Sequence, residues 1–167
     1  QMLKLMDEVH RREMKLIYCL DDVYPAAKYF ENRDWEGATG NEAIADAVVA
    51  AYKDHPALLA WYLNDELPRE MVPDLVKYYE RVKLGDPAHP CFIVLCNRRD
   101  FPHFTKTTDV FGFDTYPVPT GPVERIAGFV DYARKSVHDA QPVWFVCQAF
   151  GWYQYSKKDT DRGRIPT

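Results

Sequence analysis

The sequence lacks the features that mark several large classes of protein. No apolar run reaches about 18 residues, so nothing in the sequence predicts a membrane-spanning helix. The formal net charge is −4, and no stripe of basic residues indicates binding to nucleic acid or to an anionic membrane surface. No GxGxxG or GxxxxGK[ST] motif occurs, which leaves nucleotide binding without support. We therefore expect neither nucleic acid nor a membrane as a partner.

Cysteine is scarce, and the spacing of its four residues excludes the usual metal motifs. The cysteines are Cys19, Cys91, Cys96 and Cys147. No CxxC pair or Cys/His spacing indicates zinc, so we expect no metal site and no cofactor. Three of the four stand near the ends of apolar, strand-like runs, which predicts buried thiols rather than a disulfide framework.

Apolar segments of two kinds alternate along the chain. Helical periodicity predicts helices over residues 2–13, 41–55, 69–84 and 123–138, with Asn41 as the N-cap of the second. Continuous apolar runs predict strands over residues 14–20, 58–64, 91–96, 109–116 and 142–148. Uninterrupted runs are typical of strands buried on both faces. The alternation favours parallel pairing through crossover helices.

Polar residues at the ends of these strands favour a barrel over an open sheet. They are Asp21-Asp22, Asp65-Glu66, Asn97, Asp114 to Tyr116, and Gln148. In a (β/α)8 barrel these ends converge on one mouth, where catalysis occurs. A complete barrel needs about 250 residues. We therefore expect residues 1–167 to form one α/β domain, a parallel TIM-barrel-like fold missing the first two strands and the last, with the missing elements supplied by the rest of the protein.

Aromatic residues are abundant outside the periodic segments. Six of them are Phe30, Trp35, Phe101, Phe104, Trp152 and Tyr155. Large rings in loops indicate a surface that binds ligands with apolar faces, such as sugars. Trp35 and Trp152 are either stacking platforms for substrate or core residues.

The segment HPALLAWYLNDELP, residues 55–68, resembles strand four of the retaining (β/α)8-barrel glycoside hydrolases, the superfamily of cellulases and β-galactosidases. In that family an Asn-Glu pair ends the strand, and the Glu is the general acid/base. The resemblance implies that Glu66 takes this role and that Asn64 binds substrate, with Asp65 inserted between them. It also implies action on a poly- or oligosaccharide and favours a secreted or periplasmic location.

Two further segments resemble later strands of the same family. In DVFGFDTYP, residues 109–117, Asp114 and Tyr116 stand where strand six carries His-x-Tyr, and the family's Tyr lies against the nucleophile. In PVWFVCQAFGW, residues 142–152, Gln148 stands where strand seven carries the nucleophilic Glu. An amide cannot attack an anomeric carbon as a carboxylate does. The chain is therefore a divergent member by this resemblance.

Glycoside hydrolysis normally uses two carboxyl groups, and several acids are candidates. Glu66 is either the proton donor or a solvated acid beside the next helix. Asp114 either supplies the second carboxylate or stabilises the 117–122 turn. Asp65 either caps the next helix or acts beside Glu66, as in substrate-assisted hexosaminidases, where the substrate's acetamido group attacks. Gln148 and Asp22 could bind sugar hydroxyls.

The sequence is also compatible with a second class of function. A barrel that has lost its nucleophile would be a non-catalytic carbohydrate-binding module. For either class we expect Glu66, Asp114, Tyr116 and Gln148 to share one cleft at the carboxyl ends of the strands. The expectation rests on alternation, which would place Glu66 on the same face as Asn64 and Tyr62.

Overall fold

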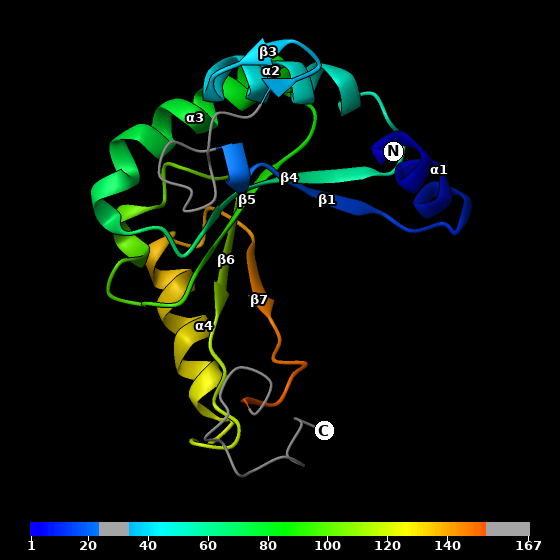
Figure 1. The fold of residues 1–167 in the computed structure, drawn as a ribbon. Coiled ribbons are helices and arrows are strands. Elements are labelled where there is room, and N and C mark those ends of the chain that lie inside the picture. The colour runs from blue at the N-terminus through cyan, green and yellow to red at the C-terminus, as the bar shows by residue number, and fades with distance from the viewer. Residues whose placement is uncertain (24–33, 153–167) are drawn as a thin grey trace.

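The computed structural model describes residues 1–23 and 34–152, so Phe30 and Tyr155 lie outside the described residues, as does the side chain of Asp22. Five parallel strands form one sheet in the order β1-β4-β5-β6-β7 (Figure 1). Their bounds are β1 Leu16–Cys19, β4 Leu58–Asp65, β5 Cys91–Leu95, β6 Val110–Asp114 and β7 Val143–Val146. The predicted parallel pairing, in chain order, is confirmed.

The helices fall close to the predicted segments. They are α1 Met2–Arg11, α2 Asn41–Tyr52, α3 Val72–Gly85 and α4 Arg125–Ser136, with short 3-10 turns η1 Asp21–Val23, η2 Arg69–Met71 and η3 Phe101–His103. The prediction that Asn41 is an N-cap is wrong. Gly40 takes that position with a φ of 84°, a conformation that glycine adopts readily, and Asn41 is the first helical residue. An antiparallel pair that the sequence did not reveal, β2 Asp34–Trp35 and β3 Ala38–Thr39, precedes α2.

The helices cover one face of the sheet. Buried residues of α2, α3 and α4 pack with one face of the strands in a single apolar cluster. The opposite face carries a separate cluster without helix residues: Phe92, Val94 and Val110, with Tyr62, Trp144 and Val146 beside them. Strands in unbroken chain order with right-handed crossovers place every helix on the same side. A doubly wound sheet would carry helices on both faces. The fold is therefore an α/β structure with a sheet covered by helices on one side.

A β-bulge in β4 changes which side chains face the cleft. Tyr62 aligns with Phe92 of β5, but the next aligned pair is Asn64 with Ile93, so the ladder skips one residue of β4. The extra residue breaks simple alternation. Tyr62 and Asp65 meet instead, and the Tyr62 hydroxyl donates to Asp65 Oδ1 at 2.7 Å. The expectation that Glu66, Asn64 and Tyr62 share a face is therefore wrong.

Gly112 of β6 leaves room for the Phe92 ring on the uncovered face of the sheet. A Cβ at this position would lie 2.2 Å from the Ile93 carbonyl oxygen and 2.4 Å from Cε2 of Phe92. The Phe92 ring contacts Tyr62 and Trp144, with ring centroids 5.3 and 5.2 Å apart. A side chain at position 112 would displace this row of rings.

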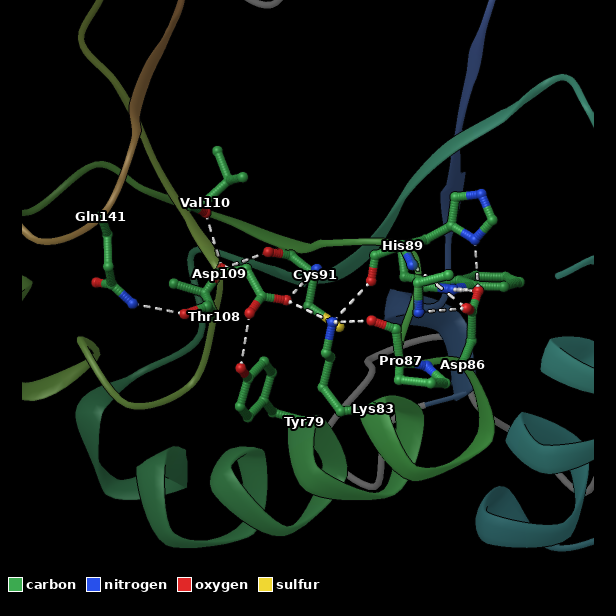
Figure 2. A network of polar contacts seen from close by, with 12 residues as sticks. Tyr79, Lys83, Asp86, Pro87, His89, Cys91, Thr108, Asp109, Val110 and Gln141 are labelled. Carbon is green, nitrogen blue, oxygen red and sulfur yellow. Dashed lines mark hydrogen bonds and ion pairs between the residues drawn. The ribbon is translucent and has the colours of Figure 1, made fainter.

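A network of polar contacts lies at the amino ends of the strands (Figure 2). Asp109, just before β6, accepts the Tyr79 hydroxyl at 2.8 Å and lies 3.2 Å from Lys83 Nζ. Asp86, just after α3, accepts the Trp61 indole N–H at 2.9 Å. These contacts join α3 to β4, β5 and β6 at the amino ends of the strands. This end of the sheet is built for stability, which is the usual division of labour in parallel α/β folds.

The exposure of the cysteines differs from the prediction. Cys91 is buried, but Cys19, Cys96 and Cys147 are exposed, so the prediction of buried thiols is wrong for these three. Each exposed cysteine stands at or beyond the carboxyl end of its strand. In residues 1–23 and 34–152, no helix is long and apolar enough to cross a membrane.

Candidate active site

A cleft of about 500 Å³ lies at the carboxyl ends of β4, β5 and β6. Its lining residues are Asp65, Glu66, Cys96, Asp114, Thr115, Tyr116, Arg125, Phe129, Phe150 and Trp152. In parallel α/β folds the carboxyl ends of strands are where ligands bind. The cleft is therefore the candidate active site.

The structure brings together most of the candidate residues from the sequence. Those lining the cleft are Asp65, Glu66, Asp114, Tyr116 and Trp152. The candidates that do not line it, among residues with described side chains, are Asn64, Gln148 and Trp35. Two further lining residues, Cys96 and Arg125, were not among the candidates from the sequence.

Glu66, Cys96 and Asp114 converge at the base of the cleft. One ligand atom from each, a carboxylate oxygen or the sulfur, lies within 4.8 Å of the other two. The Glu66 backbone N–H donates to the Val94 carbonyl at 3.0 Å, which extends the β4–β5 ladder to this residue. Glu66 has a φ of 55°, which is uncommon for a residue other than glycine. Such strain is found often at functional sites.

Asp114 is a buried acid with an altered proton affinity. Its side chain is 5% exposed, and burial raises its pKa to about 6. The hydrogen bond with Tyr116 opposes this rise in the pKa, whereas the charge of Glu66 adds to it. Within the described residues its Oδ1 atom has no hydrogen-bond partner. The carboxyl group therefore holds its proton to a higher pH than an ordinary aspartate does.

Two tyrosines accompany the acids of the cleft. Burial and the hydrogen bond to Asp114 raise the pKa of Tyr116, and burial and the hydrogen bond to Asp65 raise the pKa of Tyr62. Both phenols therefore stay protonated around neutral pH. Each can donate one hydrogen bond to its carboxylate and hold the charged oxygens in place.

Three rings form one wall of the cleft. Phe150 packs edge-on against Tyr116 with ring centroids 4.9 Å apart, and Trp152 packs edge-on against Phe150 at 5.3 Å. Edge-to-face packing leaves each ring partly open toward the cleft. Such a wall can stack against the apolar face of a sugar ring.

One basic residue also lines the cleft. Arg125, the first residue of α4, lines the cleft with Phe129 one turn further along the helix. The Arg125 guanidinium carbon lies 5.6 Å from the centre of the Phe129 ring. Sequence patterns gave this arginine no weight, because a basic residue in a helix is ordinary by itself. The available signal was its place in the first turn, where the helix dipole disfavours a cation.

The cluster of Glu66, Cys96 and Asp114 contains donor atoms that suit a divalent metal such as zinc. Burial and the neighbouring Glu66 carboxylate raise the pKa of the Cys96 thiol to about 12. Because metal binding requires a thiolate, a cation would have to displace this proton. Without a metal the protonated thiol donates toward Glu66 and helps to orient it.

Gln148 holds a loop together instead of facing the cleft. Its Oε1 accepts the Val118 N–H at 3.1 Å, and its Nε2 donates to the carbonyl oxygens of Val118 at 2.8 Å and Phe150 at 3.1 Å. This two-way pairing requires an amide, since a carboxylate has no donor for the carbonyls. The residue therefore has a structural reason to be glutamine.

Two other sequence candidates also have structural contacts. Asn64 is buried, and its Oδ1 accepts the Leu67 N–H at 2.8 Å, which shapes the turn after β4. Trp35 packs edge-on against Tyr52 of α2 with centroids 6.1 Å apart, on the helix side of the sheet. Of the two readings of Trp35, its position fits the core residue.

Comparisons with known proteins give only distant likeness. No family model matches the chain, and no curated protein matches it. Among solved structures, a GH2 β-galacturonidase from Eisenbergiella tayi is 18% identical with a TM-score of 0.48, over 62% of this chain and 20% of that one. A β-D-glucuronidase from Dictyoglomus thermophilum is 16% identical with a TM-score of 0.48, over 66% of this chain and 22% of that one. This chain thus spans about a fifth of those proteins, and likeness at this level carries no argument about the reaction.

Proposed function

We propose that the chain is part of a (β/α)8 barrel with glycoside hydrolase activity, in which Glu66 is the general acid/base and Asp114 the second carboxyl group. The observation that carries the proposal is the convergence of these two side chains in one cleft, with ligand atoms within 4.8 Å. Two facing carboxyl groups are the minimal apparatus for cleaving a glycosidic bond. The ring wall of Tyr116, Phe150 and Trp152 supplies a surface for the sugar.

The proposed reaction is direct attack by a carboxylate, because one carboxyl oxygen of Glu66 and one of Asp114 lie within 4.8 Å of each other. Inverting enzymes need about 6.5–9.5 Å between carboxyl groups to admit a water, whereas retaining enzymes use about 5–5.5 Å. Glu66 would protonate the glycosidic oxygen, and the bond from that oxygen to the anomeric carbon would break as the Asp114 carboxylate bonds to this carbon, which releases the leaving group as an alcohol. Glu66 would then deprotonate the water that hydrolyses this glycosyl ester. Asp114 from β6 thereby replaces the strand-seven carboxylate that Gln148 cannot provide.

The proposal predicts separable losses of activity. Turnover of a panel of 4-nitrophenyl glycosides, in both anomeric series, should fall by roughly 100-fold or more in Glu66→Gln, the typical size of general acid/base catalysis. Asp114→Ala should be as inactive but should regain turnover with added azide, which replaces the attacking carboxylate and yields a glycosyl azide. Glu70→Gln, an exposed acid outside the cleft, is the matched control and should turn over normally. Full activity in Glu66→Gln on a confirmed substrate would remove the acid assignment.

A non-catalytic carbohydrate-binding barrel is the second candidate, and the position of Gln148 favours it. Its amide is engaged with Val118 and Phe150, so the end of β7 places no carboxylate in the cleft. A binding module should bind oligosaccharides, measured by calorimetry, without releasing reducing ends over long incubation. Trp152→Ala should then weaken binding, whereas Glu66→Gln should leave it nearly unchanged.

A further inference from the structure

An arginine cluster adjoins the two carboxyl groups, and we propose that it binds an anionic substituent of the sugar, a carboxylate or a sulfate. The inference rests on the proposed function, because it assigns a substrate class to the same cleft. The cluster consists of Arg98, Arg99 and Arg125 around Phe129. These four residues line a second hollow of about 480 Å³, and Arg125, Phe129 and Cys96 also line the main cleft. The two hollows therefore adjoin.

Phe129 is a rigid base for two of the arginines. Its ring is 6% exposed and packs against Phe101 and Phe113, with centroids 6.2 and 6.1 Å away. The guanidinium carbons of Arg98 and Arg125 lie 5.8 and 5.6 Å from the centre of this ring. Cation–π attraction at this distance orients both side chains. Less conformational entropy is then lost when they bind a ligand.

These arginines form no ion pair with an acid among the described residues. In residues 1–23 and 34–152, no carboxylate forms an ion pair with Arg98, Arg99 or Arg125, whereas Arg81 and Arg134 each contact an aspartate at 2.7 and 2.8 Å. The guanidinium groups of Arg98 and Arg125 both lie over the Phe129 ring. An anion bound in the hollow that both arginines line would be attracted by two positive charges. The planar guanidinium fork matches a carboxylate or a sulfate oxygen pair.

The position of the cluster also gives a reason for selectivity. Asp65, Glu66 and Asp114 make one side of the cleft acidic, which disfavours an anionic sugar in most orientations. A sugar whose anionic group reaches Arg125 avoids that repulsion and presents its glycosidic bond to the carboxyl pair. Selectivity then comes from repulsion on one side and attraction on the other. An acidic saccharide is the substrate class that fits both.

The test compares matched acidic and neutral sugars by calorimetry at low ionic strength, where charge contacts are least screened. The acidic probes are glucuronate, galacturonate and glucose 6-sulfate, and the neutral probes are glucose and galactose. The acidic sugars should bind at least roughly tenfold more tightly, because charge-assisted hydrogen bonds are about twice as strong as neutral ones. Arg98→Met and Arg125→Met should weaken binding of the acidic sugars more than binding of the neutral sugars. Arg134→Met, at the far end of α4 and paired with Asp139, is the matched control.

Each outcome decides the inference. Preference for the uronates alone would identify a carboxylate, and preference for the 6-sulfate alone would identify a sulfate. Equal binding of acidic and neutral sugars, equal losses for both in the arginine variants, or no binding of any acidic sugar would overturn the inference. Because binding is measured independently of turnover, an acid preference in a protein without glycosidase activity would leave the subsite standing and remove the proposed function. Hydrolysis of neutral glycosides without acid preference would do the reverse.

Discussion

Asp114 is a buried carboxyl group, and burial makes its charged form unfavourable in the folded protein. Its pKa is raised to about 6, mainly by burial, from an ordinary value of 3.8. The folded state therefore binds the proton more tightly than the unfolded state does. The stability that this group contributes is fully present below pH 3.8 and is lost as the pH rises through 6. At neutral pH the charged Asp114 carboxylate therefore destabilises the folded protein.

Asp114→Asn should consequently stabilise the protein at neutral pH. We expect the free energy of unfolding to rise by up to about 3 kcal/mol at pH 8, since the pKa is raised by roughly two units and one unit corresponds to about 1.4 kcal/mol. The gain should disappear below pH 4, where the wild-type carboxyl group is also neutral. Urea denaturation across this pH range measures the effect, and Asp131→Asn, an exposed acid on α4, is the control. A gain that persists unchanged at acidic pH would contradict the burial argument.

The side-chain nitrogen of Gln148 makes contacts that a glutamate at this position could not make. Its Nε2 donates to the Val118 and Phe150 carbonyl oxygens at 2.8 and 3.1 Å. Replacing this amide by a carboxylate sets an anion against two acceptors. The family resemblance reads glutamine here as a lost nucleophile, but the local contacts give it a structural role.

Gln148→Glu should therefore destabilise the protein without raising any glycosidase activity. The expected loss is about 2 kcal/mol at pH 8, the penalty for two unsatisfied carbonyls and a misplaced charge. The loss should shrink in acid, because a protonated Glu regains one donor. Thermal unfolding at two pH values and 4-nitrophenyl glycoside turnover measure both parts. An increase in turnover would mean that position 148 does reach the substrate.

At the scale of elements, two glycines that look alike in sequence have opposite roles. Gly112 lies in β6, where a Cβ would overlap the Ile93 oxygen and the Phe92 ring. Gly128 lies within α4, where a Cβ would meet nothing within 4 Å. The first glycine is required by packing between strands, and the second only weakens its helix.

The same substitution should change stability in opposite directions at these two sites. Gly112→Ala should destabilise by about 3 kcal/mol or more, because backbone and a packed ring must both move. Gly128→Ala should stabilise by up to about 1 kcal/mol. Urea denaturation of the two single variants is the measurement, and each variant is the control for the other. Similar effects at both sites would show that packing on the uncovered face of the sheet is loose.

At the scale of the whole molecule, the two ends of the sheet treat a buried aspartate in opposite ways. At the amino end, burial alone would raise the pKa of Asp86, but hydrogen bonds from Trp61, His89 and Ala88 outweigh it and lower the pKa (Figure 2). At the carboxyl end, burial prevails and the pKa of Asp114 rises. At the amino end, hydrogen bonds stabilise the charged form of the buried aspartate. At the carboxyl end, burial favours the protonated form.

Asp86→Asn should weaken the fold and leave the cleft unchanged. The side chain is 2% exposed and accepts from Trp61 Nε1 at 2.9 Å and contacts His89 Nδ1 at 2.7 Å. We expect a loss of about 2–3 kcal/mol at neutral pH, the size of hydrogen bonds to a charged group. Because the folded pKa is lowered, this contribution is present above 3.8 and is lost as the pH falls through the folded value. Urea titrations should show the wild type and the variant converging in acid, while sugar binding stays equal.

The sequence by itself determined the order of helices and strands, their parallel pairing and the end of the sheet that carries polar residues. These features follow from local periodicity and from short apolar runs, which are written along the chain. It also pointed to Glu66, Asp114 and Tyr116, because residues that follow parallel strands meet at one edge. These properties depend on neighbours in sequence.

Only the tertiary structure decided which side chains face one another. The bulge in β4 places Asn64 beside Ile93, and it depends on the register with β5. The pairing of Gln148 with Val118 joins groups 30 residues apart. Arg125 lines the same cleft as the acids because α4 packs against the sheet, where Phe129 contacts Phe113 of β6. Register and side-chain direction are long-range properties, since a shift of one residue reverses every face, and local patterns carry no record of them.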